Sequence, residues 1–358
     1  MGKVVSIMPI KRVTMQDIAD ACGLSRNTVS KVFNNRGAVP PPTRSLILQK
    51  AKELGYGIPA QPDSPPQSFP VPGPAEGNSI ALLTCNMPVD YHFGTYFVTA
   101  FTDQICRAGY TLKMFELSGD ELRQKRLPPH FSLNQTAGIV GIELFDRKYM
   151  DFVCALGLPT IFVDGPAYSG LDLLPCDIIL MENWASNIAV ISHLASLGAK
   201  YIGFCGDKEH CCSFSERWMG YKLGLQLSGL PLDEKLCITE PDSSPYNHPD
   251  WLISRFDRMP RLPDAMVCAN DYLAVHVMNA LKKKGLSVPD DVMITGFDGT
   301  SQSALVEPPL TTVQIPSIDI GRMAAETLLS RIRNPALPYS WTHVRTTPVW
   351  RRSTQGKK

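Results

Sequence analysis

A cluster of seven prolines between residues 57 and 78 constrains the fold more than any other feature of the sequence. Proline has no backbone N–H to donate and its ring fixes φ, so this stretch cannot form a regular helix or an inner strand. We expect an extended, semi-rigid linker over residues 58–78. A 358-residue chain is also too long for one ordinary core. The sequence therefore predicts a small domain over residues 1–57, a large body over 79–350 and a C-terminal tail over 351–358.

Basic side chains are concentrated at the N-terminal end. Residues 1–59 carry nine Lys and Arg against three acids, whereas the rest of the chain carries 26 against 31. A basic head on an acidic body predicts contact with a polyanion at one end only. No apolar run reaches the roughly 18 residues of a membrane span, and residues 1–11 lack the apolar core of a secretory signal. We expect a cytoplasmic protein without membrane association.

The ten cysteines show no C-x-x-C pair and no regular spacing, so we expect reduced thiols that pack as small hydrophobes. His210-Cys211-Cys212 is the cluster that hints at a metal, but adjacent residues rarely reach one ion and no second ligand pair follows. The sequence also lacks a P-loop, G-x-S-x-G, G-x-G-x-x-G and H-E-x-x-H. We therefore predict no metal, no cofactor and no enzymatic activity.

Residues 13–56 have the pattern of three short helices. Thr14 is a good N-cap, and Asp17 three residues later can complete a variant of the capping box. Gly23 ends this first helix and Ser25 caps the next, which we expect over residues 26–33. Thr43 is expected to cap a third helix that ends at Gly55. A helix, a turn with glycine and a second helix form the DNA-binding helix-turn-helix.

In that geometry the second helix enters the major groove with its N-terminal residues toward the bases. Arg26 can pair bidentately with guanine and Asn27 with adenine. A small bundle with a solvated polar face is the alternative for the same spacing. The candidate DNA-binding residues are Thr14, Ser25, Arg26, Asn27, Thr28, Ser30, Lys31 and Asn34.

Beyond residue 79, apolar strand-like runs alternate with amphipathic helices. We expect strands over 80–84, 111–115, 138–142, 160–163, 178–180, 201–205, 265–268 and 292–296. We expect helices over 96–108, 186–197, 217–227, 272–284 and 318–332. This rhythm predicts an α/β fold of βαβ units, whose parallel sheets are covered on both faces and are long enough for two doubly wound lobes. Ligands bind such lobes beyond the carboxyl ends of the strands.

Two candidate ligand residues follow predicted strands. Arg217 is expected to open a helix after a strand and loop, and Asp271 starts a helix after the strand at 265–268. An Arg fork with a carboxylate can satisfy vicinal hydroxyls or a carboxylate-bearing ligand; the alternative is that both residues are surface caps. Asp298 is either a third contact or a turn residue. The aromatic candidates for the cleft are Phe93 and Tyr96.

Residues 13–34 resemble the start of the lactose-repressor (LacI/GalR) family, with V-T-M-Q-D-I-A, G-L-S, T-V-S-K-V and N in register. The resemblance continues in E-R-W-M-G-Y at 216–221, A-N-D-Y-L-A at 269–274 and G-F-D at 296–298. It implies that Arg26, Asn27 and Lys31 contact bases. It also implies that Arg217 grips an effector and that the Asp of the N-D segment, here Asp271, binds ligand hydroxyls.

The resemblance implies a homodimeric transcriptional regulator, by default a repressor, that binds operator DNA and a sugar or sugar derivative between two periplasmic-binding-protein-like lobes. This chain departs from the family after Gly55-Tyr56, because prolines replace the leucine-bearing hinge helix. We therefore predict an absent or remodelled hinge. The alternatives are a regulator whose body only oligomerises, a cytoplasmic sugar-binding protein, and an enzyme on the same scaffold.

Overall fold

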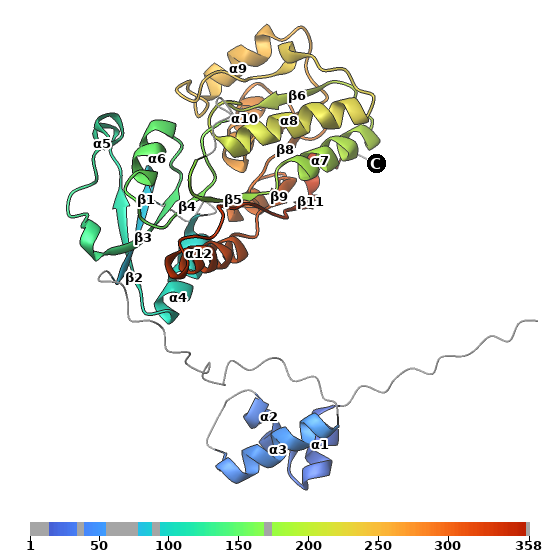
Figure 1. Ribbon diagram of the computed structural model, residues 1–358. Coiled ribbons are helices and arrows are strands. Elements are labelled where there is room, and N and C mark those ends of the chain that lie inside the picture. The colour runs from blue at the N-terminus through green and yellow to red at the C-terminus, as the bar shows by residue number, and fades with distance from the viewer. Residues whose placement is uncertain (1–13, 34–38, 55–77, 88–93, 168–173, 356–358) are drawn as a thin grey trace, which may run out of the picture. The chain divides into compact units, whose positions relative to one another are not determined.

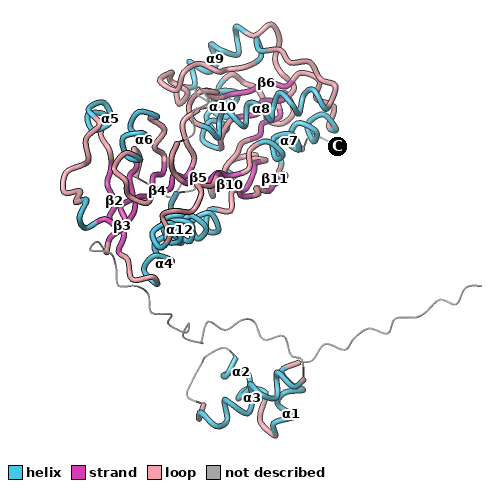
Figure 2. The backbone as a smooth tube through the Cα atoms, in the orientation of Figure 1, coloured by secondary structure: helices cyan, strands magenta, loops and turns pink. Residues whose placement is uncertain are grey.

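The computed structural model describes residues 14–33, 39–54, 78–87, 94–167 and 174–355 (Figures 1 and 2). The chain divides into two compact units, Met1–Val71 and Pro72–Lys358. All but the last residue of the predicted linker over 58–78 lies outside the described residues, as do Asn34 and Phe93. None of the described helices is long and apolar enough to cross a membrane.

The first unit consists of three short helices around a small core (blue in Figure 1). They are α1 (Met15–Cys22), α2 (Arg26–Phe33) and α3 (Pro41–Glu53). The core side chains are fully buried and come from all three helices: Ile18, Ala19, Val29, Val32, Ile47 and Ala51. Val29 and Val32 are three residues apart and Ile47 and Ala51 are four apart, so each of these pairs shares one helix face. Burial of these faces packs α2 and α3 against α1.

The predicted N-cap of α1 is confirmed. The backbone N–H of Asp17 donates to Thr14 Oγ1, and the N–H of Thr14 donates to Asp17 Oδ2 at 2.7 Å, which completes the capping box. At the other end Gly23 adopts φ 65°, a left-handed conformation that glycine tolerates best. These two signals set the start and the end of the helix that precedes the turn.

We expect Thr14→Ala to loosen this helix, because it leaves the Asp17 N–H without its side-chain acceptor. The loss of an N-cap costs about 1 kcal/mol, which speeds local amide exchange roughly fivefold. Hydrogen–deuterium exchange of the peptide covering residues 14–22 in the full-length chain measures it. Thr14→Ser keeps the hydroxyl and is the control, and equal exchange in the two variants would refute the capping role.

The third helix begins earlier than predicted. Thr43 does not cap it, because α3 already starts at Pro41. Proline is well suited to the first position of a helix, where its missing N–H has no intrahelical partner to lose. The predicted end at Gly55 lies outside the described residues.

The second unit contains two lobes. The sheet of the first lobe has the order β10-β5-β4-β3-β1-β2, and all of its neighbours are parallel. Its strands are β1 (Ser79–Thr84), β2 (Thr111–Glu116), β3 (Thr136–Ile142), β4 (Thr160–Val163), β5 (Asp177–Met181) and β10 (Trp341–Val344). Its helices are α4 (Gly94–Arg107), α5 (Gly119–Gln124), α6 (Arg147–Cys154) and α12 (Ser317–Arg333). Successive residues of β1 pack into different cores, because the sheet is covered on both faces.

The second lobe is built on a parallel sheet in the order β6-β7-β8 (Figure 1). Its strands are β6 (Ile202–Cys205), β7 (Ala265–Cys268) and β8 (Met293–Thr295), with the antiparallel pair β9 (Thr312–Gln314) and β11 (Thr347–Val349). Its helices are α7 (Trp184–Ser196), α8 (Cys212–Leu227), α9 (Pro249–Arg258), α10 (Asp271–Lys283) and α11 (Ser301–Leu305). The eight predicted strands are confirmed, with small differences at their ends; β9, β10 and β11 were not predicted.

Three segments connect the lobes: β5 to α7, β9 to α12, and β10 to β11. Two of them are hydrogen-bonded to each other, since Glu182 N donates to Val344 O at 2.8 Å and Thr346 Oγ1 donates to Glu182 O at 2.7 Å. Because each lobe has its own sheet and only short segments join them, the body has the architecture of two lobes about a hinge.

The predicted tail over 351–358 requires a correction, because its first residues belong to the second lobe. Ser353 and Thr354 are fully buried. Ser353 Oγ donates to Ile294 O at 2.6 Å and accepts from Thr311 N at 2.8 Å. The short polar side chains satisfy backbone groups at the edge of the sheet, so the body extends at least to Thr354.

Candidate functional site

The first candidate site is the outer face of α2. Arg26, Asn27 and Lys31 are exposed and lie on one side of the helix, whereas Val29 and Val32 are buried on the other. None of the three exposed side chains makes a hydrogen bond within the described part of the chain. A guanidinium, an amide and an ammonium on one face can contact base edges and phosphates in a major groove.

The hydroxyl-bearing candidates have local structural partners. Ser25 Oγ accepts from Thr28 N at 3.2 Å and is hydrogen-bonded to Thr28 Oγ1 at 2.9 Å. Ser25 is therefore the N-cap of α2, as the sequence predicts, and Thr14 is the N-cap of α1. Ser30 is half-buried, and Asn34 lies outside the described residues. These contacts fix the turn that presents Arg26 and Asn27.

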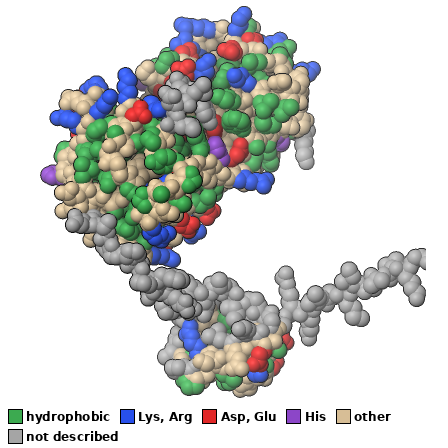
Figure 3. All heavy atoms as spheres, viewed as in Figure 1, with side chains coloured by type: hydrophobic (Ala, Val, Ile, Leu, Met, Phe, Trp, Pro, Cys, Tyr) green, Lys and Arg blue, Asp and Glu red, His purple; other side chains and the backbone are tan. Residues whose placement is uncertain are grey.

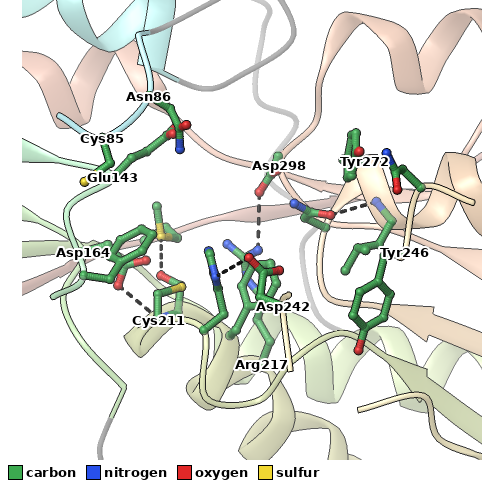
Figure 4. A pocket seen from close by; sticks show the side chains of 18 of the residues that line it. Cys85, Asn86, Glu143, Asp164, Cys211, Arg217, Asp242, Tyr246, Tyr272 and Asp298 are labelled. Carbon is green, nitrogen blue, oxygen red and sulfur yellow. Dashed lines mark hydrogen bonds and ion pairs between the residues drawn. The ribbon is translucent and has the colours of Figure 1, made fainter. Parts of the chain in front are cut away.

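The second candidate site is a cavity of about 1000 Å³ between the two lobes of the body (Figure 4). Its lining comes from segments at the ends of β1, β3, β4, β5, β6, β7 and β8, from the first turns of α8 and α10, and from the loop over residues 242–247 before α9. Parallel strands end on the same edge of their sheet, so these segments converge there. A concave site with a few convergent polar groups is typical of small-molecule binding.

Arg217 is fixed at the base of this cleft and is almost fully buried. Its Nε donates to Asn183 Oδ1 at 2.9 Å, and its Nη1 donates to Ala269 O at 2.7 Å and to Asp298 Oδ1 at 3.4 Å. The guanidinium also stacks on the ring of Phe297, with 3.7 Å from its central carbon to the ring centroid. These contacts hold a charged, planar donor in one orientation before any ligand binds.

Asp298 lies in the cleft beside Arg217 and adopts φ 117°, a conformation that is strained for a residue with a side chain. Burial raises the pKa of its carboxyl to about 8; the Arg217 charge opposes this shift, and Asp271 and Glu143 add to it. The structure therefore brings together two of the predicted ligand residues, Arg217 and Asp298.

Asp271 does not point into the cleft and is absent from its lining. One carboxylate oxygen accepts from Thr300 N at 2.8 Å and Thr300 Oγ1 at 2.9 Å, and the other accepts from Thr312 Oγ1. A Cβ at Gly296 would collide with this carboxylate. The expectation that Asp271 meets the ligand is thus corrected, because its acceptors are used to hold the loop after β8. The preceding residue, Asn270, lines the cleft instead.

A buried polar network behind Arg217 was missed in the sequence. Asn183 Nδ2 donates to Glu216 Oε2 at 2.8 Å, and His343 Nε2 is hydrogen-bonded to Glu216 Oε1 at 2.9 Å. Asn183 belongs to one inter-lobe connection and His343 lies on β10 beside another. The signal available in the sequence was Glu216 next to Arg217 on the same helix. The network links the cleft floor to the hinge.

The start of α8 also differs from the prediction, since Arg217 lies in its second turn and Cys212 begins it. The N-cap residue, Cys211, makes no side-chain cap. Instead the first lobe supplies the acceptors: Asp164 Oδ1 accepts from Ser213 N at 3.1 Å, and Gly165 O accepts from Cys212 N at 2.8 Å. Burial raises the pKa of Asp164. A helix N-terminus favours such acceptors, so this contact joins the lobes.

Aromatic side chains of both lobes line the cleft. Phe145 of the first lobe meets the ring of His210 edge to face, and Phe214 of α8 contacts the same ring. Tyr246 and Tyr272 complete the list of aromatic lining residues. Tyr96, a predicted lining residue, is 58% exposed and is not part of the cleft. Phe93 lies outside the described residues.

The described residues contain no cluster of three His, Cys, Asp or Glu side chains that could hold a metal ion. The ten cysteines are free thiols, and only Cys106 is exposed.

On the face drawn in Figure 3, basic side chains of the body lie at several separate places among hydrophobic and acidic ones. The chemistry offered by the described cleft is thus hydrogen bonding, charge and stacking.

Comparison with known families separates the two units. Residues 14–58 match the family of bacterial regulatory proteins described as the lacI family. Residues 191–354 match the periplasmic binding protein-like domain. The first match covers α1, α2 and α3, and the second covers most of the lobe that carries Arg217 and Asp298.

Whole proteins and solved structures cover more of the chain. The ribose operon repressor of Haemophilus influenzae is 27% identical over 96% of this chain and 99% of its own. The transcriptional regulator CelR in complex with cellobiose shares the fold, with a TM-score of 0.67 and 22% identity over 96% of this chain and all of its own. The lac repressor dimer bound to operator and the anti-inducer ONPF has a TM-score of 0.64 and 23% identity over 96% and 99%.

The head thus matches a family of regulatory proteins and the body a periplasmic binding protein-like domain, and the ribose operon repressor is similar to the chain across nearly all of its length. The chain presents an exposed polar face on α2 in the head and a cleft floored by Arg217 in the body. The chain therefore belongs to the LacI family of bacterial regulatory proteins and is a DNA-binding transcriptional regulator.

Proposed function

We propose that this regulator is a cytoplasmic homodimeric repressor, whose paired heads bind a pseudo-palindromic operator and release it when a small molecule occupies the cleft. The observation that carries the proposal is the single exposed face of α2 with Arg26, Asn27 and Lys31, held by a capped turn. One head reads only a few base pairs, so specific binding needs two heads on two half-sites.

The effector in this proposal is a sugar or sugar derivative. Arg217 and Asp298 offer donors and acceptors to ring hydroxyls, and the aromatic walls offer stacking surface. The ribose operon repressor and the cellobiose complex of CelR are similar proteins whose names mention sugars. The lac repressor, which is described as a dimer, supports the homodimer.

The route from cleft to head is proposed to run through lobe closure. Asp164 and Gly165 of one lobe bind the N-terminus of α8 in the other. A ligand that closes or opens the lobes changes these contacts and thereby the dimer surface. The coupling is reciprocal and typically amounts to 1–3 kcal/mol. The signal would have to pass through the proline-rich stretch after Tyr56, which lacks the hinge leucine of the family pattern.

Selection from a random-sequence duplex library with the purified full-length chain tests the proposal. We expect a pseudo-palindromic consensus and a complex with two chains per duplex, measured by sizing with light scattering. A consensus without two-fold symmetry, or one chain per duplex at saturation, would contradict the dimer. If the selection enriches no sequence, the claim that α2 recognises specific bases is contradicted. If the body serves only for oligomerisation, the selection still yields a consensus sequence, but no small molecule changes the affinity for it.

A further inference from the structure

The charges of the cleft point to a particular class of effector. Five carboxyl groups line it, against one Arg side chain and one histidine among the described residues. The carboxyl groups are those of Glu143, Asp146, Asp164, Asp242 and Asp298. They come from both lobes, so a ligand between the lobes has acidic groups on two sides (Figure 4).

The positive charge of Arg217 is already used within the protein. It is bound to Asn183, Ala269 and Asp298 and is stacked on a ring, as described above. An anionic ligand would have to compete with Asp298 for this guanidinium while facing the other four carboxylates. Like charges brought together in a partly dehydrated cleft repel each other and weaken binding.

The field of the cleft is negative enough to affect its histidine. Burial lowers the pKa of His210, but the hydrogen bond to Asp242 and the nearby carboxylates of Asp164 and Asp207 outweigh burial, so the net shift is upward. Burial raises the pKa of Cys85 and of Asp298, and the charge of Glu143 adds to both shifts, after that of Asp146 for Cys85 and that of Asp271 for Asp298. Asp242 and Asp164 line the cleft themselves, so a cation bound near them would be stabilised as the charged form of His210 is.

The aromatic side chains of the cleft can also bind a sugar ring that carries an ammonium group. Phe145, Phe214, Tyr246 and Tyr272 line it from both lobes. Aromatic faces attract ammonium groups and also pack against the apolar face of a sugar ring. Carboxylates accept hydrogen bonds from hydroxyls and form stronger, charge-assisted ones with an ammonium.

We propose that the cleft selects a hydroxylated ligand that bears an amine, of which an amino sugar is the simplest example, over neutral or anionic sugars with the same ring. The proposal rests on the proposed function, in which this cleft is the effector site. Glu143 of the first lobe is the residue that would discriminate, because it lines the cleft, whereas the Asp298 carboxyl of the second lobe is already paired with Arg217.

Isothermal titration calorimetry with the full-length protein tests the selection. The probes are D-glucosamine, D-galactosamine and D-mannosamine, each compared with its parent sugar and with the 6-phosphate of that sugar. At least one amine should bind tenfold or more tightly than its parent, as expected for a charge-assisted contact, and no phosphate should bind. A parent sugar or phosphate that binds as tightly as its amine, or three amines that all fail to bind, would overturn the proposal.

Glu143→Gln should reduce the preference for the amine by about tenfold while leaving the affinity for the parent sugar nearly unchanged. Glu326→Gln, an exposed carboxylate on α12, is the matched control and should change neither. An unchanged preference in Glu143→Gln would contradict its assigned role. Operator selection separates the two proposals: a clear consensus without any amine preference refutes only the ligand class.

Discussion

Replacing Arg26 and Asn27 together by alanine is expected to remove most sequence-specific DNA binding. Each bidentate base contact is worth about 1–3 kcal/mol of discrimination, so the pair accounts for about 2–6 kcal/mol per head. Both side chains are exposed and make no hydrogen bond within the described residues, so the helix should fold as before. The core on the opposite face of α2 keeps Val29 and Val32.

Fluorescence anisotropy at fixed salt measures this, with the selected operator and a scrambled duplex as probes. Lys50→Ala is the matched control, because it also removes one positive charge from the same unit but lies on α3. The double variant should lose the preference for the operator and keep weak, salt-sensitive binding. An equal loss in both variants would mean that only charge matters and would refute base reading by α2.

Replacing Arg217 by alanine is expected to weaken ligand binding in the cleft by one to two orders of magnitude. The guanidinium is buried and donates to Asn183, to Ala269 and to Asp298. Without the guanidinium, Asn183 and Asp298 lose the donor that orients them and the ligand loses a charged donor in the cleft. A hydrogen bond to a charged group is worth about 1.5–3 kcal/mol, so we expect the affinity to fall about tenfold to 150-fold. Calorimetry with whichever probe binds the parent protein measures the loss.

Two further variants separate binding from folding. Arg217→Lys keeps the charge but not the planar fork, so it should fold and still bind less tightly. Asp271→Asn should lower the melting temperature more than it lowers ligand affinity, since its carboxylate serves Thr300 and Thr312 rather than the cleft. Undiminished binding in Arg217→Ala, or a selective loss of binding in Asp271→Asn, would contradict the site.

Local signals in the sequence were sufficient for α1 and for the start of α2, but not for the start of α3. A capping pair at Thr14 and Asp17, a glycine at 23 and a serine at 25 set the limits of α1 and α2, and all of these signals act within one helical turn. The strands at 160–163 and 265–268 were predicted to the residue, because each is a short apolar run that is buried on both faces.

The cleft could be predicted only in part, because its details depend on distant contacts. The cap of α8 comes from Asp164 and Gly165 in the other lobe, so no signal near Cys212 marks the start of that helix. The roles of Asp271 and Asp298 could not be told apart either, since both follow strands. Their difference depends on Thr300 and Thr312, which the fold brings against one of them.

The strands β9, β10 and β11 escaped prediction for a related reason. β10 is partly exposed and pairs with β5, which precedes it by a long stretch of chain. β11 contains Pro348 and pairs only with β9. Such short edge strands carry little periodicity of their own, and their pairing follows from the crossings between the lobes.

The central claim is that the cleft controls the head, and the operator affinity of the full-length protein with and without a bound cleft ligand tests it most directly. The probe is the amino sugar or sugar that binds most tightly in calorimetry. We predict that a saturating concentration changes the dissociation constant for the operator by about 5- to 150-fold, and that Arg217→Ala abolishes this change but keeps the ligand-free affinity. An operator affinity that stays the same while the cleft is demonstrably occupied would contradict the account.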